Sequence, residues 1–140
     1  MQKIIIISMF YTILWADDFV GIVKSLNGKV YIKRQNKIFN LTVGYLLRKG
    51  DIIITNKKSS VGITFDDGSR LSLGENSIFN INRYIFQPSK NKFDINLKLL
   101  KGKALFNSGK VGEMAPESVK FNIPEGVIGI RGTEFLVEAK

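Results

Sequence analysis

The chain has 140 residues, of which 44% are hydrophobic and 24% are charged, a composition typical of one folded domain. It contains no cysteine and no histidine, which excludes zinc fingers, Cys and Ser–His nucleophiles and imidazole acid–base catalysis. The formal charge of +9 favours anionic partners such as lipid headgroups or acidic envelope polymers, but lysines that only solvate a β-fold would give the same excess.

The N-terminus has the pattern of a secretory signal peptide. The basic segment MQK precedes an apolar run over residues 4–14, and Ala16 is a small residue suited to a cleavage position. The run is shorter than the roughly 20 residues of a membrane-spanning helix. A buried first strand is the alternative, but the run is longer than a usual strand of about 5–6 residues. We expect residues 1–16 to be a cleaved signal peptide and residues 17–140 to form one periplasmic domain in a bacterial envelope.

From residue 20 onward, short apolar or alternating runs are separated by Gly, Asn and Asp, which predicts an all-β fold. The runs over residues 20–24 and 29–34 flank Asn27-Gly28, a pair that accepts the positive φ angles of a tight turn. They are predicted to form the first hairpin. A strand over residues 37–43 follows, and the β-branched run over residues 52–55 is typical of a strand covered on both faces.

A second hairpin is predicted around the turn Asp66-Asp67-Gly68-Ser69, between strands over residues 61–65 and 70–73 with their odd positions facing the core. The later elements are read in the same way. They are a strand over 78–86, a polar loop over 87–92, strands over 93–100 and 104–106, a long loop over 107–118, and closing strands over 119–123 and 126–137.

Glycine recurs before short apolar strands, at Gly28, Gly50, Gly68, Gly102 and Gly126. Short strands joined by such tight corners predict a solenoid-like stack of strands and hairpins, with an irregular β-sandwich as the alternative.

The closing segment GVIGIRGTEFLV changes parity, because Ile128 and Ile130 occupy even positions and Phe135 and Val137 odd ones. One strand face cannot hold all of them without a slip of one residue, so we expect a bulge or corner at Arg131-Gly132. The guanidinium of Arg131 is expected to tie this corner to carbonyls or to an acid such as Asp51 or Asp67, and a contact with a partner is the alternative.

Several stretches, taken in order, resemble the FecR domain: GKVYIKR, KGDIIIT, SVGITFDDGSRLSLGENS, LKLLKGKALF and FNIPEGVIGIRGTEFLV. The resemblance implies an all-β, solenoid-like domain that acts in protein interaction and signal relay, with Lys101-Gly102-Lys103 as a further hairpin. The residues that match its motifs are Gly50, Asp51, Asp67, Gly68, Ser69, Gly102, Gly129, Arg131, Gly132 and Thr133.

FecR-type regulators carry a cytoplasmic segment that holds a sigma factor, a transmembrane helix, and a further module that contacts a receptor. In this chain the expected signal peptide stands in place of the cytoplasmic segment. We therefore expect no direct sigma-factor contact. The expected function is that of an exported module that binds an envelope protein. Binding of an anionic envelope polymer or lipid, or membership of an iron-responsive signalling system, are the alternatives.

Catalysis, metal binding and cofactor binding are not expected. Asp66 and Asp67 are adjacent on a turn, where we expect them to be solvated, and they cannot form the two-carboxylate cleft of a glycosidase. Too few oxygen ligands surround them for a calcium site. Nucleic-acid binding would need exposed stacking aromatics, whereas Tyr31, Phe39 and Phe86 are expected on the core face.

Overall fold

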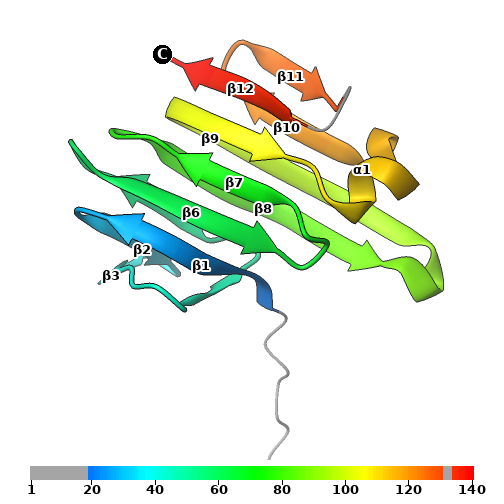
Figure 1. Cartoon of the computed structure of the whole chain (residues 1–140), viewed down its shortest axis with the longest axis horizontal. Coiled ribbons are helices and arrows are strands. Elements are labelled where there is room, and N and C mark those ends of the chain that lie inside the picture. The colour runs from blue at the N-terminus through cyan, green and yellow to red at the C-terminus, as the bar shows by residue number, and fades with distance from the viewer. Residues whose placement is uncertain (1–18, 131–133) are drawn as a thin grey trace, which may run out of the picture.

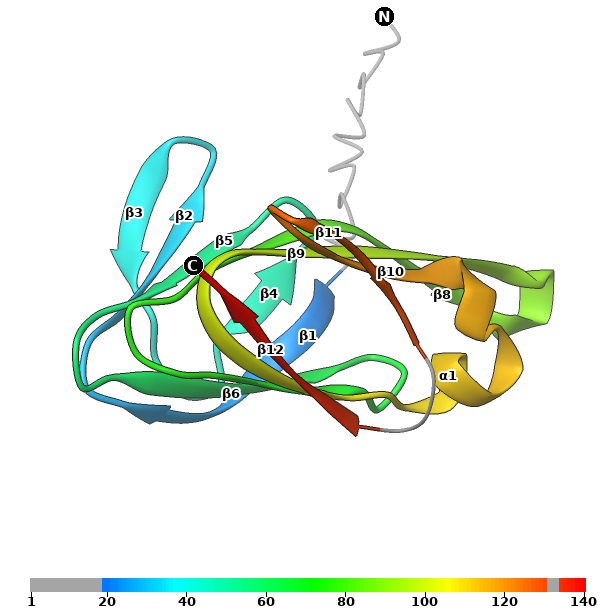
Figure 2. The same ribbon diagram turned by 90° about the horizontal axis from the view of Figure 1, so that it is seen from above.

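A computed structural model describes residues 19–130 and 134–140. It confirms an all-β fold: a 12-stranded sheet, curled into a half-barrel, encloses the hydrophobic core (Figures 1 and 2). Solenoid-like stacking is not confirmed. The described part of the chain holds no helix long and apolar enough to cross a membrane.

The first strands are β1 (Phe19–Asn27), β2 (Val30–Arg34), β3 (Lys37–Asn40), β4 (Leu46–Arg48), β5 (Ile52–Thr55) and β6 (Ser60–Phe65). They are followed by β7 (Arg70–Leu73), β8 (Ile78–Gln87), the short 3-10 helix η1 (Pro88–Lys90) and β9 (Lys92–Asn107). The helix α1 (Lys110–Met114), η2 (Pro116–Ser118), β10 (Val119–Ile123), β11 (Gly126–Gly129) and β12 (Glu134–Ala139) complete the described chain.

The two walls of the half-barrel are joined by β9, which is 16 residues long. Its first part pairs with β8 and β10 in one wall, and its last part pairs with β7 and β12 in the other. The prediction of a hairpin at Lys101-Gly102-Lys103 was therefore wrong, because the strand continues through this point. Gly102 has a φ of 100° and marks a change of parity, since Leu97 and Leu99 are buried before it and Ala104 and Phe106 after it.

The predicted first hairpin was also wrong. Gly28 does adopt the positive φ of a turn, 76°, but β1 pairs with β4 and β6, whereas β2 pairs with β3 and β5. The turn moves the chain from one wall to the other. The connection from β5 to β6 crosses beside it, and Lys29 N donates to Ser59 Oγ at 2.9 Å. Local turn chemistry sets the backbone angles, but this tertiary packing sets the strand pairing.

The second hairpin, β6–β7, is confirmed, with Ile63 opposite Leu71 and Val61 opposite Leu73, and all four side chains buried. The strand β5 is confirmed, but its coverage on both faces is not: Ile53 and Thr55 are buried while Ile52 and Ile54 are half-buried.

Three further expectations fail. The predicted long loop over residues 107–118 contains α1 and η2. The strand predicted over residues 37–43 ends at Asn40, and Phe39, expected on the core face, lies on an edge strand with 43% of its surface exposed. Phe86, in contrast, packs against the core.

The closing segment does interrupt itself as predicted. β11 ends at Gly129 and pairs with β10, whereas β12 begins at Glu134 and pairs with β9 (Figure 1). Val137 is buried, and Phe135, Ile128 and Ile130 pack against the core from the two strands. Arg131, Gly132 and Thr133, which carry the expected corner, lie outside the described residues.

Candidate functional site

The turn between β6 and β7 contains a buried carboxylate. Asp67 is 1% exposed, so the expectation that it is solvated was wrong. Its side chain accepts hydrogen bonds from Ser69 N at 3.0 Å, Ser69 Oγ at 2.7 Å, Val111 N at 3.2 Å and the hydroxyl of Tyr84. A buried carboxylate is tolerated where donors surround it in this way.

This turn also holds α1 in place. Lys110 N donates to the main-chain oxygen of Asp67 at 2.9 Å, and Gly109 N donates to Ser69 Oγ at 2.8 Å. A Cβ added to Gly109 would lie 2.4 Å from both Asp67 O and Ser69 N, so only glycine permits this approach. Asp67, Gly68 and Ser69 are thus brought together as a clamp on the segment that closes one end of the half-barrel.

A second buried carboxylate lies at the corner between β4 and β5. Asp51 is 1% exposed, and its carboxylate accepts hydrogen bonds from Arg34 Nε at 2.9 Å and Arg34 Nη2 at 2.7 Å. The two side chains form a bidentate ion pair. Arg48 N donates to the same carboxylate at 2.7 Å. Gly50 has a φ of 88° and makes the corner possible. Both acids suggested for Arg131 therefore have partners from other parts of the chain.

The other described motif glycines, Gly102 and Gly129, lie apart from these corners. A Cβ at Gly102 would lie 2.0 Å from Ser77 Oγ, because the bend of β9 packs directly on the buried Ser77. Gly129 ends β11, and a Cβ there would meet no atom of the described residues within 4 Å.

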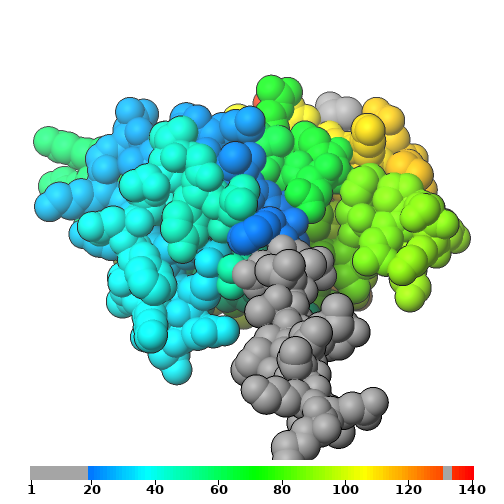
Figure 3. Space-filling model, turned by 90° about the horizontal axis from the view of Figure 1, so that it is seen from below, coloured from blue at the N-terminus to red at the C-terminus, as the bar shows by residue number. Residues whose placement is uncertain are grey.

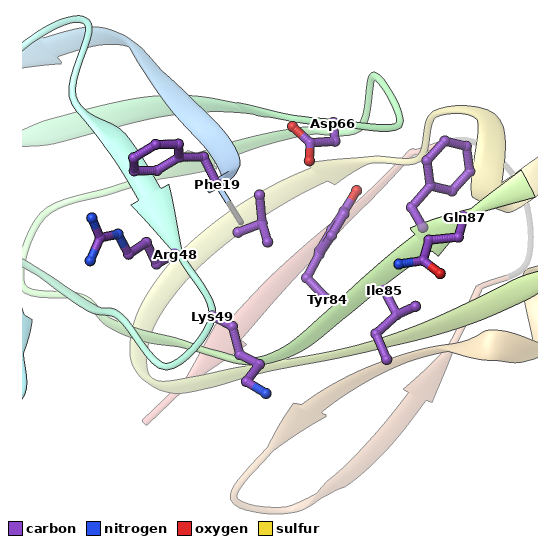
Figure 4. A pocket seen from close by; sticks show the side chains of 9 residues that line it. Phe19, Arg48, Lys49, Asp66, Tyr84, Ile85 and Gln87 are labelled. Carbon is purple, nitrogen blue, oxygen red and sulfur yellow. The ribbon is translucent and has the colours of Figure 1, made fainter. Parts of the chain in front are cut away.

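A groove of about 550 Å³ opens between the two corners (Figure 4). Arg48 and Lys49 come from the Asp51 corner, Asp66 comes from the Asp67 turn, and Tyr84 lies between them. The other described residues of the lining are Phe19, Val20, Ile85, Phe86 and Gln87. Figure 3 views the end of the molecule where β1 begins, with the connection between β8 and β9 on one side (yellow-green) and the β3–β4 region on the other (cyan).

The groove combines apolar surface with charge of both signs. Phe19 and Ile85 are each 37% exposed, and the guanidinium of Arg48 lies 5.1 Å from the ring centre of Phe19. Burial, and secondly the charge of Asp67, raise the pKa of the Asp66 carboxyl above its usual 3.8. Burial and the charge of Asp67 also raise the pKa of Tyr84, so this hydroxyl stays protonated and donates to Asp67.

The described lining of the groove has little acid–base material. The described lining offers one carboxylate, whereas hydrolysis by paired acids needs two across a cleft. The described residues also include no group of three or more Asp or Glu side chains placed to hold a metal ion. The groove combines exposed apolar side chains, Phe19 and Ile85, with the two cations Arg48 and Lys49.

Tyr84 and Arg34, which satisfy the two buried acids, were not predicted from the sequence. Their partners are 17 residues away in the chain, so no local motif connects them. The available signal was the pair of aspartates themselves, each next to a glycine at the start or end of an apolar strand.

The family of the domain is shown by a match over most of the described chain. A model of the family "FecR protein" matches residues 51–140. This chain belongs to the FecR family. FecR domains are generally periplasmic signalling domains of iron-responsive systems, and the family is regulatory rather than catalytic.

The FecR assignment rests on the family match alone. No curated protein matches the chain. A solved structure described as a "Cell surface anchoring domain" is 27% identical, covers 44% of this chain and 82% of its own, and has a TM-score of 0.42.

Proposed function

We propose that this FecR domain is an exported, non-catalytic module of the envelope that binds a protein partner at the groove between the Asp51 and Asp67 corners. The exposure of Phe19 and Ile85 beside Arg48 and Lys49 carries the proposal. Exposed apolar side chains flanked by charge are typical of interaction sites. Membership of a regulatory family supports the same role.

The two buried aspartates act as scaffold in this proposal. Each fixes a corner that presents groove residues: Asp51 binds the main-chain nitrogen of Arg48, and Asp67 is adjacent to Asp66 and bonded to Tyr84. The family motif therefore sets the shape of the groove, and its less constrained neighbours contact the partner. The expected partner surface is an apolar side chain next to a carboxylate: the apolar side chain would meet Phe19 or Ile85, and the carboxylate would meet Lys49.

Site-specific photo-crosslinking tests the location of the contact. A photoreactive amino acid replaces Ile85 in the full chain, expressed with its own N-terminus, and a second chain carries it at Leu136. Leu136 is 71% exposed on β12, outside the groove, so it is the matched control. We expect one envelope protein to be captured from position 85 and not from position 136. Equal capture from both positions would refute the groove as the contact site.

Export is part of the proposal and has its own test. Residues 1–16 are expected to be removed, so the mature protein should begin at Asp17. Mass spectrometry of the protein recovered from the envelope measures this directly. An intact N-terminus on envelope-located protein would contradict cleavage while leaving the groove proposal open to the crosslinking test.

A further inference from the structure

A cluster of asparagines lies away from the groove, on the outer face of one wall of the half-barrel. This wall is formed by β5, β8, β9, β10 and β11, and Figure 2 shows it opposite the wall that contains β1 and β6. Asn82 Nδ2 donates to Asn96 Oδ1 at 3.0 Å, and Asn122 Nδ2 donates to the same oxygen at 2.8 Å. Asn122 Nδ2 also donates to Leu97 O at 3.0 Å. These bonds hold three amides from three strands in fixed orientations.

The three amides keep hydrogen-bonding groups that no described residue uses. Asn96 Oδ1 accepts two bonds, so its Nδ2 keeps its donors; Asn82 and Asn122 each keep an oxygen acceptor. None of these leftover groups has a hydrogen-bond partner among the described residues. Asn80 Oδ1, on the same face, is enclosed and also lacks a partner there. Donors and acceptors that alternate in this way match hydroxyl groups, which both donate and accept.

The cluster borders a depression of about 410 Å³, lined by the three amides, Lys98 and the turn between β10 and β11. Lys98 and Lys120 lie on the same outer face, next to Asn122 and Asn96 in the sheet register. Neither lysine has an ion pair among the described residues. Glu125 on the turn adds a single opposing charge. The surface therefore favours a ligand that bears carboxylates as well as hydroxyls.

The sheet register gives this surface the shape of a track. Cross-strand neighbours form a row through six strands, at right angles to them: Lys33, Ile52, Asn80, Lys98, Asn122 and Val127. Five steps at the usual strand spacing of ~4.8 Å make a row about 24 Å long. Val127 at one end is 63% exposed, and the inner members are half-buried. A linear polymer fits such a row better than a compact small molecule does.

We propose that this asparagine–lysine row is a binding site for a strand of carboxylate-bearing polysaccharide. The amides would bond the hydroxyls, and Lys98 and Lys120 would meet the carboxylates. Nucleic acid fits less well, because stacking of bases needs exposed aromatic rings at the centre of the site and the row has none among its six members.

Affinity measurements on the full chain test the proposal with three probes of matched length: oligogalacturonate, a neutral galactose oligomer, and polyglutamate, which has carboxylates but no hydroxyls. Oligogalacturonate should bind most tightly. Asn96→Ala and Lys98→Glu should each weaken it about tenfold or more. Lys57→Glu makes the same charge change on the exposed loop before β6, and should have a small effect. Thermal unfolding of each variant checks that it is folded.

If Asn96→Ala does not fold, the affinities of Lys98→Glu and Lys57→Glu for oligogalacturonate still decide the test. Equal binding of polyglutamate, with Asn96→Ala unchanged, would overturn the proposal and leave only general charge attraction. Failure to bind oligogalacturonate would overturn it too. So would tighter binding of single-stranded DNA or of phosphatidylglycerol vesicles with the same dependence on Asn96.

Discussion

Tyr84 donates its hydroxyl hydrogen bond to Asp67, and so links β8 to the turn between β6 and β7 in the opposite wall of the half-barrel. The ring of Tyr84 also stacks on Phe65, with centroids 5.0 Å apart and planes 13° from parallel. Tyr84 therefore satisfies a buried charge and forms the floor of the groove at the same time.

The first prediction concerns this bond. Tyr84→Phe keeps the stacking but removes a donor from a buried carboxylate, and we expect the free energy of unfolding to fall by about 1–3 kcal/mol. Urea denaturation measures the change. Tyr31→Phe is the control, because Tyr31 is half-buried and its hydroxyl makes no hydrogen bond within the described chain. Equal losses of unfolding free energy in the two variants would show that the hydrogen bond to Asp67 does not stabilise the fold.

Alkaline pH should act through the same residue. The pKa of Tyr84 is raised above the ordinary 10.0, so the unfolded chain releases this proton at a lower pH than the folded chain. The stability that Tyr84 contributes is complete below pH 10 and is lost as the pH rises above it toward the folded pKa. Unfolding free energies measured between about pH 9 and 11 should fall less steeply in Tyr84→Phe than in the wild type. Identical slopes would contradict the shift.

Close backbone packing at Gly109 predicts a strong effect of one methyl group. Gly109→Ala would place a Cβ 2.4 Å from main-chain atoms of Asp67 and Ser69, which cannot move aside, and should destabilise the fold by about 1–3 kcal/mol. Hydrogen exchange over residues 108–118 should rise in the same variant. Gly129→Ala, where a Cβ would meet no atom within 4 Å in the part of the chain that the structure describes, should leave both measurements near wild type.

Two arginine–aspartate pairs of the described residues should differ in how much they contribute to stability. Arg34→Met leaves the buried Asp51 without its bidentate partner, and we expect a loss of about 3–5 kcal/mol in unfolding free energy. Arg83 and Asp94 form a pair at 3.1 Å whose side chains are 52% and 47% exposed. Arg83→Met should therefore change stability by less than about 1 kcal/mol. Chemical denaturation of both variants measures these changes. Similar losses of unfolding free energy in the two variants would contradict the prediction.

The sequence was sufficient for the all-β class and for some of the turns, but not for the strand pairing. Asn27-Gly28 predicts a turn, and Gly28 does adopt a positive φ, yet the flanking strands part because each finds a partner in a different wall. Gly102 shows the same limit: its flexibility bends a continuous strand rather than closing a hairpin. Turn chemistry is local, whereas pairing depends on which apolar faces meet across the core.

The candidate site divides in the same way. The aspartates of the family motif were identified from the sequence, but Asp67 was expected to be solvated. Its burial depends on Tyr84, 17 residues away, and on Val111, 44 residues away. The asparagine cluster was also missed, because Asn82, Asn96 and Asn122 come together only through the pairing of β8, β9 and β10.

Partner retention by Ile85→Asp tests the central claim most directly. Ile85 lines the groove and is already 37% exposed, so a charge there should leave the melting temperature close to that of the wild type while preventing apolar contact with a partner. The account predicts that the envelope protein crosslinked from position 85 is no longer recovered with Ile85→Asp, and is still recovered with Leu136→Asp. Recovery of that protein at the wild-type level with Ile85→Asp would contradict the account.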